Sequence, residues 1–436
     1  MDRREFLKAT AAGAAGLAIA SCNNGKTVAQ VSESGPGKMF ENFPGFGALG
    51  FGCMRFPMYT GSDYARYVDQ AKVDEMVDRA MAAGVNYFDS APVYLQGKSE
   101  AATAAALSRY PRDSYYIATK LSNFRAEGNI LEDGKAMYRR SLEIYGTDHI
   151  DFYLLHSLGS LEEFNKRFAD CGLIDFLLKE RVDGHIRKLG YSFHGEREGF
   201  DELLSLHERY HWDFVQIQMN YVDWKYSDAE YMYNELEKRG IPVVIMEPLL
   251  GGALAKLPAA LSFALKEHRP ESSDASWALR FAADHKGVLT VLSGMTCMEH
   301  LEDNLNTFCH FEHLTDEERL LLARTADDFH NFPLIKCTGC RYCMPCKYGI
   351  DIPGIFSFYN KSVNDGTYVS SSEQKGYERE RRRYLLSYGK AVPTLSQADH
   401  CIACGKCLSA CPQRIRIPAE LKRIDNYIES LKQELL

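Results

Sequence analysis

Three features that define large classes of proteins are missing from this sequence. Once the first 22 residues are set aside, no apolar run is long enough to span a bilayer. Basic side chains are not in excess: 59 acidic residues outnumber 51 basic ones and the net charge is −8, which argues against bulk binding to nucleic acid. No G-x-G-x-x-G motif follows the first predicted strand. What is present is 436 residues, 45% of them hydrophobic, enough for two or three domains with a large core.

The first 22 residues read as a targeting segment rather than as part of the fold. The pair Arg3-Arg4 precedes a mildly apolar stretch of Ala, Gly and Leu, with Asp2 where a Ser or Thr is usual. This pattern resembles a twin-arginine export signal, and its end at Cys22 resembles a bacterial lipoprotein cleavage box. We therefore expect a periplasmic protein or one with a lipid anchor at Cys22, followed by a flexible linker over residues 23–37. An ordinary N-terminal helix is the alternative.

Eight of the 13 cysteines lie in two short runs near the C-terminus. The runs are Cys337, Cys340, Cys343, Cys346 and Cys401, Cys404, Cys407, Cys411. Thiols spaced three residues apart converge on one small volume, which suits a metal centre better than disulfides. The second run, C-x2-C-x2-C-x3-C-P, has the spacing of a [4Fe–4S] site in bacterial ferredoxins. Two four-thiolate zinc sites are the alternative.

In two-cluster ferredoxins, the fourth cysteine of each run ligates the other cluster. Carried over, this resemblance implies one cluster held by Cys337, Cys340, Cys343 and Cys411 and another held by Cys401, Cys404, Cys407 and Cys346. The fourth cysteine of the first run follows after two residues rather than three. Helical patterns over 377–389 and 418–436 make this region resemble an all-helical two-cluster ferredoxin domain, predicted over residues 313–436.

Between residues 40 and 310, short apolar segments alternate with amphipathic helical stretches, of which 72–84 is the clearest. The predicted strands cover 47–52, 86–90, 115–120, 151–156, 188–192, 214–219, 242–247 and 288–294. Eight strand–helix units in this length predict an α/β fold, a (β/α)8 TIM barrel over residues 38–312. An open, doubly wound sheet is the alternative, weakened by the missing glycine motif.

Polar side chains stand at the carboxyl ends of successive predicted strands, where such barrels place their chemistry. Asp89, Lys120 and His156 end the second, third and fourth strands, and Tyr94 follows Asp89 closely. A Lys ammonium lowers the pKa of a neighbouring tyrosine, and an Asp keeps that Lys charged. A His donates a hydrogen bond to a carbonyl oxygen, which takes the Tyr proton as hydride arrives. Each residue alone has a structural interpretation, as a helix cap, a surface charge or a core histidine, but their joint placement favours catalysis.

Several segments follow, in order, the landmarks of the aldo–keto reductase family, among them GVNYFDSAPVYLQGKSE (84–100), DFYLLHS (151–157) and SGMTCMEHLEDNL (293–305). The resemblance covers roughly residues 40–308. It implies a TIM barrel, a nicotinamide cofactor and a catalytic tetrad of Asp89, Tyr94, Lys120 and His156. The whole chain resembles the subgroup of these reductases that carries a C-terminal 4Fe–4S dicluster domain.

The same resemblance implies a set of cofactor contacts. They are Ser192, Gln216, Gly294, Met295, Thr296, His300 and Asn304. The family's Ser-Asn after the fifth strand is Ser192-Phe193 here, and Gly294 and His300 stand where a Lys and an Arg usually face the adenosine phosphate. Because both fixed cations are replaced, NAD and NADP stay open.

We expect an iron–sulfur aldo–keto reductase that moves hydride between NAD(P) and a small carbonyl or alcohol substrate. The sequence shows no flavin motif to split the two electrons of hydride, so the clusters are either structural or connect to a membrane electron carrier. The alternative function is an electron-transfer or interaction protein with an inactive barrel, against which the intact tetrad argues. Substrate selectivity is expected in the segments 58–67, 121–129 and 221–227.

Overall fold

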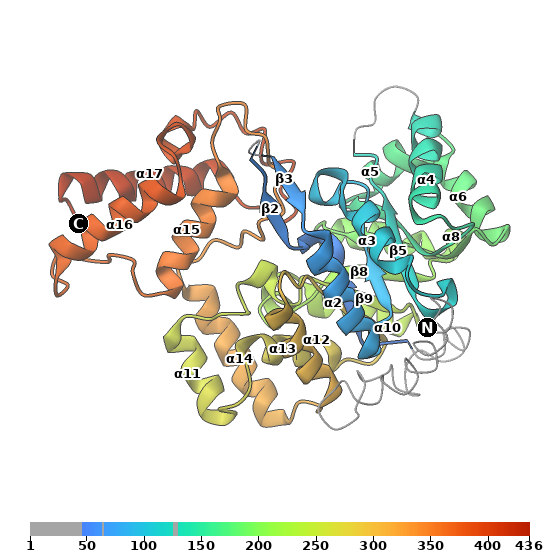
Figure 1. Cartoon of the computed structure of the whole chain (residues 1–436), viewed down its shortest axis with the longest axis horizontal. Coiled ribbons are helices and arrows are strands. Elements are labelled where there is room, and N and C mark those ends of the chain that lie inside the picture. Colours follow the sequence, from blue (N-terminus) through green and yellow to red (C-terminus); the bar gives the residue numbers. More distant parts are fainter. Residues whose placement is uncertain (1–45, 63–64, 125–129) are drawn as a thin grey trace, which may run out of the picture. The chain divides into compact units, whose positions relative to one another are not determined.

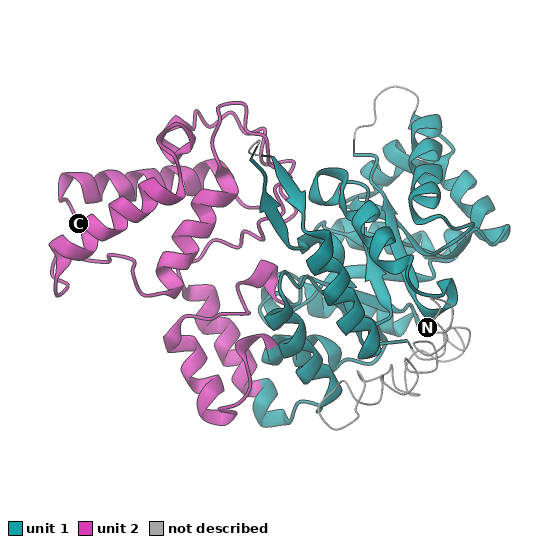
Figure 2. Cartoon of the chain, viewed as in Figure 1, with its two compact units in different colours: residues 1–248, 276–319 teal, residues 249–275, 320–436 magenta. Residues whose placement is uncertain are grey.

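The structure is a computed structural model that describes residues 46–62, 65–124 and 130–436. The chain divides into two compact units, residues 1–248 with 276–319 and residues 249–275 with 320–436 (Figure 2). The second unit thus takes in residues 249–275, which the sequence analysis placed with the barrel. The predicted targeting segment, Cys22 and the linker over 23–37 lie outside the described residues, so export and lipidation stay predictions.

The first unit is built on a closed barrel of parallel strands, drawn in Figure 1. In order around the barrel the strands are β1 (Leu49–Gly52), β4 (Tyr87–Asp89), β5 (Tyr116–Leu121), β6 (Ile150–Leu158), β7 (Ile186–Phe193), β8 (Phe214–Gln218), β9 (Val243–Met246) and β10 (Val288–Ser293). Parallel pairing of β10 with β1 closes the ring. Each strand overlaps a predicted one, so the (β/α)8 prediction is confirmed and the open sheet was the wrong alternative.

Helices of the first unit alternate with the strands. They are α2 (Gln70–Ala82), α3 (Ser99–Leu107), α4 (Ile130–Tyr145), α5 (Leu161–Phe164), α6 (Leu173–Val182), α7 (Arg197–Ser205), α8 (His207–Tyr210), α9 (Asp223–Tyr226), α10 (Ala229–Lys238), α12 (Asp274–Ala283), α13 (Met298–Cys309) and α14 (Asp316–Asn331), the last running into the second unit. Helix α2 begins where the Asp69 carboxylate accepts a hydrogen bond from the Lys72 amide, and it buries Val73, Met76, Val77 and Ala80 at helical spacing.

The barrel strands are buried on both faces, as parallel strands covered by helices must be. Aromatic side chains fill part of the interior: the rings of Tyr87, Phe152 and Phe46 stand 5.0–5.7 Å apart between centroids, and Phe214 lies 5.2 Å from Phe152. Close ring packing of this kind makes the barrel a solid core rather than a pore. A rigid core holds the carboxyl ends of the strands in a fixed relation to one another.

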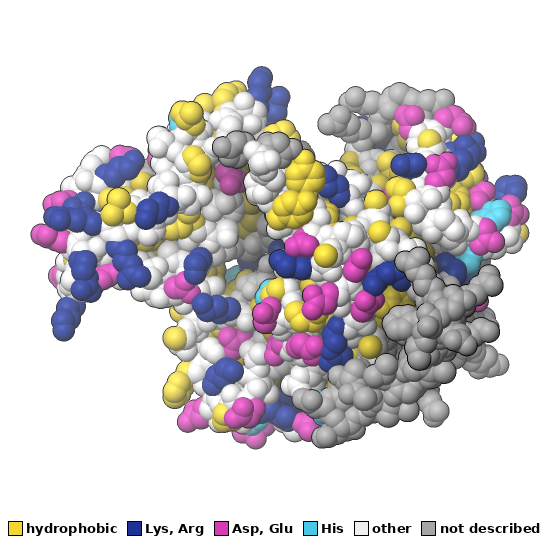
Figure 3. Space-filling view, in the orientation of Figure 1, with side chains coloured by type: hydrophobic (Ala, Val, Ile, Leu, Met, Phe, Trp, Pro, Cys, Tyr) yellow, Lys and Arg dark blue, Asp and Glu magenta, His cyan; other side chains and the backbone are white. Residues whose placement is uncertain are grey.

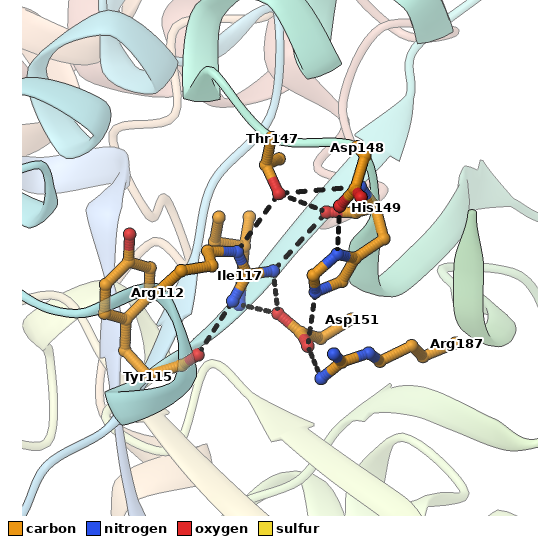
Figure 4. Close-up of polar contacts among 8 residues, drawn as sticks. All are labelled: Arg112, Tyr115, Ile117, Thr147, Asp148, His149, Asp151 and Arg187. Atoms are coloured by element: carbon orange, nitrogen blue, oxygen red, sulfur yellow. Dashed lines mark hydrogen bonds and ion pairs between the residues drawn. The ribbon is translucent and has the colours of Figure 1, made fainter. Parts of the chain in front are cut away.

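A buried ion-pair cluster fastens the amino ends of β5, β6 and β7 (Figure 4). Asp151, near the start of β6, accepts hydrogen bonds from Arg112 at 2.6 Å, from Arg187 at 2.9 Å and from the Ile117 amide at 2.9 Å. Because Asp151 is fully buried, each of these donors is needed to offset the cost of its desolvation. Polar clusters at this end of such a barrel serve stability, which separates this one from the catalytic end.

A two-stranded antiparallel hairpin, β2 (Met58–Thr60) and β3 (Arg66–Val68), follows β1. It takes in most of the segment 58–67, in which substrate selectivity is predicted. On the face drawn in Figure 3, acidic and basic side chains are interspersed. Among the described residues, no helix combines the length and the hydropathy that crossing a bilayer requires.

The second unit consists of helices and the loops that carry the cysteines. Its helices are α11 (Ala259–His268), α15 (Ile352–Asn364), α16 (Tyr377–Ala391) and α17 (Ile417–Gln433). Residues 320–436 are all described and contain no strand, which confirms the predicted helical region. Helix α16 is not wholly solvated, because Tyr384 and Tyr388 enter the core formed with Phe356 of α15 and Leu421 of α17.

Candidate active site and cysteine clusters

The centre of the candidate site is a lysine buried between two strands. Lys120, the last residue but one of β5, is fully buried, and its Nζ donates to Asp89 Oδ1 at 2.6 Å and to the Ser90 carbonyl at 2.7 Å. The register pairs Asp89 of β4 with Ala118 of β5, so the side chain two residues further along points to the same face and reaches the carboxylate. Burial lowers the pKa of Lys120 and raises that of Asp89, and their mutual attraction opposes both shifts.

Tyr94 lies directly against this ammonium. The Lys120 Nζ is 4.8 Å from the centroid of the Tyr94 ring, and Tyr94 is 9% exposed. Tyr94 opens the short turn η3 (Tyr94–Gly97), in which Leu95 and Gln96 have φ angles of 51° and 59°. Two successive non-glycine residues in the left-handed region form a strained backbone, of the kind that collects at functional sites.

His156 completes the predicted group of four. Its ring centroid is 5.7 Å from that of Tyr94, with the planes at 81°, and its Nδ1 lies 2.6 Å from Ser122 Oγ. Burial lowers the pKa of His156 well below its usual range, and the charges of Lys120, His194 and Arg167 lower it further. A neutral imidazole keeps one N–H to donate, which is what the predicted hydrogen bond to a carbonyl oxygen needs. The structure therefore brings Asp89, Tyr94, Lys120 and His156 together.

The strand that carries His156 is bulged at that residue. Leu155 pairs with Tyr191 and the next pair is Leu158 with Phe193, so His156 and Ser157 together face a single residue of β7, Ser192. Ser157 has a φ of 55°, and its amide donates to Ser192 Oγ at 2.8 Å. Ser192 was predicted as a cofactor contact. In the structure its hydroxyl braces the bulge, and contact with a cofactor stays a prediction.

Phe193, which replaces the family's Asn, turns toward α7, where its ring lies 5.3 Å from that of Phe200. The next residue, His194, has a buried Nδ1 without a partner among the described residues. Burial lowers the pKa of His194 to about 4, and the charge of Lys120 contributes. A Cβ on the following Gly195 would overlap the Gly159 carbonyl, so only glycine allows these two loops to pack so closely. The sequence reasoning missed His194, whose signal was its place just after a strand end.

The other predicted cofactor residues lie on β8, in the loop between β10 and α13, and on α13. Gln216 is buried, its Nε2 lies 3.5 Å from Met246 Sδ, and its Oε1 has no partner among the described residues. Asn304 Nδ2 donates to Ser293 Oγ at 2.7 Å. The Thr296 amide points at His300 Nδ1 over 3.4 Å, and Met295 is fully buried.

Arg55 is a cation that the sequence reasoning missed. It ends the turn η2 (Cys53–Arg55), directly after β1. Its stem lies against Gly294, because a Cβ built on that glycine would be 3.0 Å from Arg55 Cδ. The stem of Arg55 thus lies beside one of the positions where the family pattern has a cation. No sequence prediction covered the end of the first strand.

In the second unit, the thiols gather in two groups that mix the two sequence runs. Burial raises the pKa of Cys343 to about 12, and the neighbouring thiols of Cys340, Cys337 and Cys411 add to the rise. Burial likewise raises the pKa of Cys407, with contributions from Cys401, Cys404 and Cys346. The first group also lines a pocket with apolar side chains that include Ile352, Phe356, Ile415 and Ile417. These two groupings match the exchanged ligand sets that the resemblance implies.

Fold and site together define a (β/α)8 barrel with a buried Asp–Lys–Tyr–His group, joined to a helical unit with two thiol quartets. Residues 48–322 match the model of the aldo/keto reductase family, and residues 336–415 match that of the 4Fe-4S dicluster domain. The chain belongs to the aldo/keto reductase family and carries a C-terminal 4Fe-4S dicluster domain. Family homologues are oxidoreductases.

Relatives in two kingdoms share the barrel part of the chain. The oxidoreductase YqkF of Bacillus subtilis is 24% identical over 311 residues, covering 65% of this chain and 94% of that protein. L-galactose dehydrogenase of Arabidopsis thaliana is 23% identical over 265 residues, covering 56% and 80%. Among solved structures, glycerol dehydrogenase of Gluconobacter oxydans has a TM-score of 0.53 at 19% identity, covering 67% of this chain and 96% of that one. An aldo-keto reductase of Bacillus halodurans in its holo form has 0.51 at 24%, covering 64% and 91%, so both share the fold.

Proposed function

We propose that this protein transfers hydride between a nicotinamide cofactor, NAD or NADP, and a carbonyl or alcohol substrate, with Tyr94 as the general acid and base. The observation that supports this most strongly is the buried Lys120 ammonium, held by Asp89 on one side and lying 4.8 Å from the Tyr94 ring on the other. A lysine enclosed in this way serves little purpose for stability alone, because removing its charge from water costs several kcal/mol.

The residues act as a unit on the oxygen of the substrate. A nicotinamide bound at the strand ends would supply the hydride. The Tyr94 hydroxyl donates its proton to the oxygen as negative charge develops there, and the Lys120 ammonium stabilises the resulting phenolate. The neutral His156 imidazole donates a hydrogen bond to the same oxygen. Asp89 keeps Lys120 charged despite its burial. In the direction of alcohol oxidation, the same groups take the proton back.

Unpaired polar atoms support a polar ligand beside this group. Gln216 Oε1 and His194 Nδ1 are both buried without partners among the described residues, and such atoms are costly unless a ligand or water satisfies them. Arg55, whose stem lies beside Gly294, is the candidate cation for a phosphate of the cofactor. With one such cation in place of the two that the family pattern provides, NAD and NADP both remain open.

Substituting Tyr94→Phe removes the proton donor and keeps the ring against Lys120. We expect kcat for the reduction of an aldehyde or ketone panel to fall by about 100-fold or more, since positioned proton transfer contributes on that order. Loss of reduced nicotinamide absorbance measures the rate, and binding of the cofactor, followed by its fluorescence, should be retained. Tyr231→Phe is the matched control, because Tyr231 donates to Asp201 on the outer helices. Equal rates for wild type and Tyr94→Phe would refute this assignment and favour the inactive-barrel alternative.

We further propose that each thiol group holds one [4Fe–4S] cluster, with Cys337, Cys340, Cys343 and Cys411 on the first and Cys401, Cys404, Cys407 and Cys346 on the second. The apolar walls of the first pocket fit a cluster, because they exclude water from the sulfur ligands. When bound, such clusters carry single electrons. The four thiols of each group come from both sequence runs, whereas zinc knuckles use pairs of C-x2-C motifs.

Two double variants that share Cys411 separate the exchanged ligand sets from local ones. With exchanged sets, Cys337→Ala/Cys411→Ala damages one cluster and leaves about four iron atoms per chain, whereas Cys401→Ala/Cys411→Ala damages both. Local sets predict the opposite pattern. Iron and sulfide analysis with visible absorption measures the outcome after anaerobic purification. A colourless protein that contains zinc would contradict the iron–sulfur assignment altogether.

In this proposal, the clusters either connect the barrel to a membrane electron carrier or support the fold of the second unit.

We propose export by the twin-arginine route, which carries folded proteins with their cofactors, to the periplasm or to a lipid anchor at Cys22. Cell fractionation tests this: the wild-type chain should reach the envelope, and a variant with Arg3→Lys and Arg4→Lys should stay in the cytoplasm. The same distribution of both chains would contradict the proposal.

A further inference from the structure

A buried arginine that the mechanism does not use lies behind the catalytic histidine. Arg167 sits in η5 (Asn165–Ala169), a π-helical turn between α5 and α6, and it is 6% exposed. Single π-helical turns are rare and occur often at functional sites. The guanidinium carbon lies over two aromatic rings, 5.2 Å from the centroid of Phe124 and 5.0 Å from that of Phe168. Cation–π contacts of this kind favour a buried guanidinium at that position.

The fork of Arg167 binds the two carbonyl groups at the bulge of β6. Its Nη2 donates to the His156 carbonyl at 2.6 Å, and its Nη1 donates to the Ser157 carbonyl at 3.0 Å. Asn123, which follows β5, accepts from Nη2 at 3.4 Å and donates to the Arg167 carbonyl at 2.9 Å. One side chain therefore connects the end of β5, the bulge and the π-helical turn.

The hydrogen bonds of this guanidinium go to backbone carbonyls rather than to a carboxylate. Among the described residues, Arg167 forms no ion pair, although Glu163 is near enough to oppose the effect of burial, which lowers the pKa of Arg167 to about 10. Burying a cation without a carboxylate is costly, and it is retained where the group fixes a geometry. Nη1 and Nη2 each donate to a backbone carbonyl, and Nε is buried without a partner among the described residues.

We propose that Arg167 is a positioning residue that fixes the bulge of β6 and thereby aims the His156 imidazole at the substrate oxygen. Ser192 braces the same bulge from the other side, through the Ser157 amide. The left-handed Ser157 backbone, with a φ of 55°, is strained and holds its conformation only while these contacts persist. The role of Arg167 in turnover rests on the proposed function, whereas its effect on His156 is structural and holds without it.

Two substitutions separate the geometry of the fork from its charge. Arg167→Lys keeps a cation but replaces the rigid planar fork with a compact ammonium on a flexible stem, and Arg167→Gln removes the cation. Both should lower kcat for carbonyl reduction by about 10- to 100-fold with little change in the KM of the cofactor, because a misaimed catalytic group costs rate. Lys166→Gln is the matched control, since Lys166 is exposed and lies in the same π-helical turn.

The histidine itself supplies a readout that does not depend on activity. In spectra of the chain with labelled histidines, assigned with His156→Gln, both Arg167 variants should shift the His156 resonances. Arg167→Gln should also raise the pKa of His156, because it removes one of the charges that lower it. The other charged or titratable groups that face His156, Lys120 from β5, Tyr94 from η3 and His194 after β7, are unchanged. Arg167→Lys should leave the pKa of His156 lowered.

Unchanged kcat and unchanged His156 resonances in a folded Arg167→Lys protein would overturn the inference. If Arg167→Gln does not fold, as judged by its thermal transition, Ser192→Ala tests the same bulge from the other side and should shift the same resonances. Failure of the proposed function shows differently: turnover would then be unaffected by Tyr94→Phe, while the His156 resonances would still respond to Arg167.

Discussion

The barrel mouth depends on one buried pair, the Lys120 ammonium and the Asp89 carboxylate 2.6 Å apart. Neither charge is stable alone in this place, because burial disfavours the charged form of each. Together they constrain the positions and the charge states of the groups around them. The ammonium must lie between β4 and β5, Tyr94 must enter by a strained turn to reach it, and His156 must stay neutral beside it. In the proposed function, this arrangement is preorganised for the charge that develops on a substrate oxygen.

The two ends of the barrel use charge differently. At the amino ends, Asp151 is surrounded by two arginines and an amide and has the donors its burial requires. At the carboxyl ends, Asp89 Oδ2, Gln216 Oε1 and His194 Nδ1 are left without partners among the described residues. The paired carboxylate at the amino ends stabilises the fold, whereas the unpaired polar atoms at the carboxyl ends can form hydrogen bonds with a ligand. At the carboxyl end of β6, a bulge and the buried Arg167 hold the backbone of His156.

Structural features that leave a periodic pattern or a fixed spacing in the sequence were predicted correctly. All eight strands and the helical C-terminal region follow from hydrophobic periodicity, and the meeting of Asp89, Tyr94, Lys120 and His156 follows from their places at or just after strand ends. Their catalytic role stays a prediction. Arg167 and His194 were not predicted, because a π-helical turn and a close approach of two glycine-containing loops decide where they lie. Arg55 follows the first strand, whose end no prediction covered. The grouping of residues 249–275 with the second unit was also missed, since no composition change marks it.

The coupling between Asp89 and Lys120 is the most direct test of this account. Unfolding free energies of the wild type, Asp89→Asn, Lys120→Met and the double variant form a double-mutant cycle. Each single change should cost about 3–5 kcal/mol, because it leaves one charge buried without its partner. The double change should cost far less than the sum, since it removes both charges. Costs that add to within about 0.5 kcal/mol would mean that the two groups do not interact, and would contradict the account.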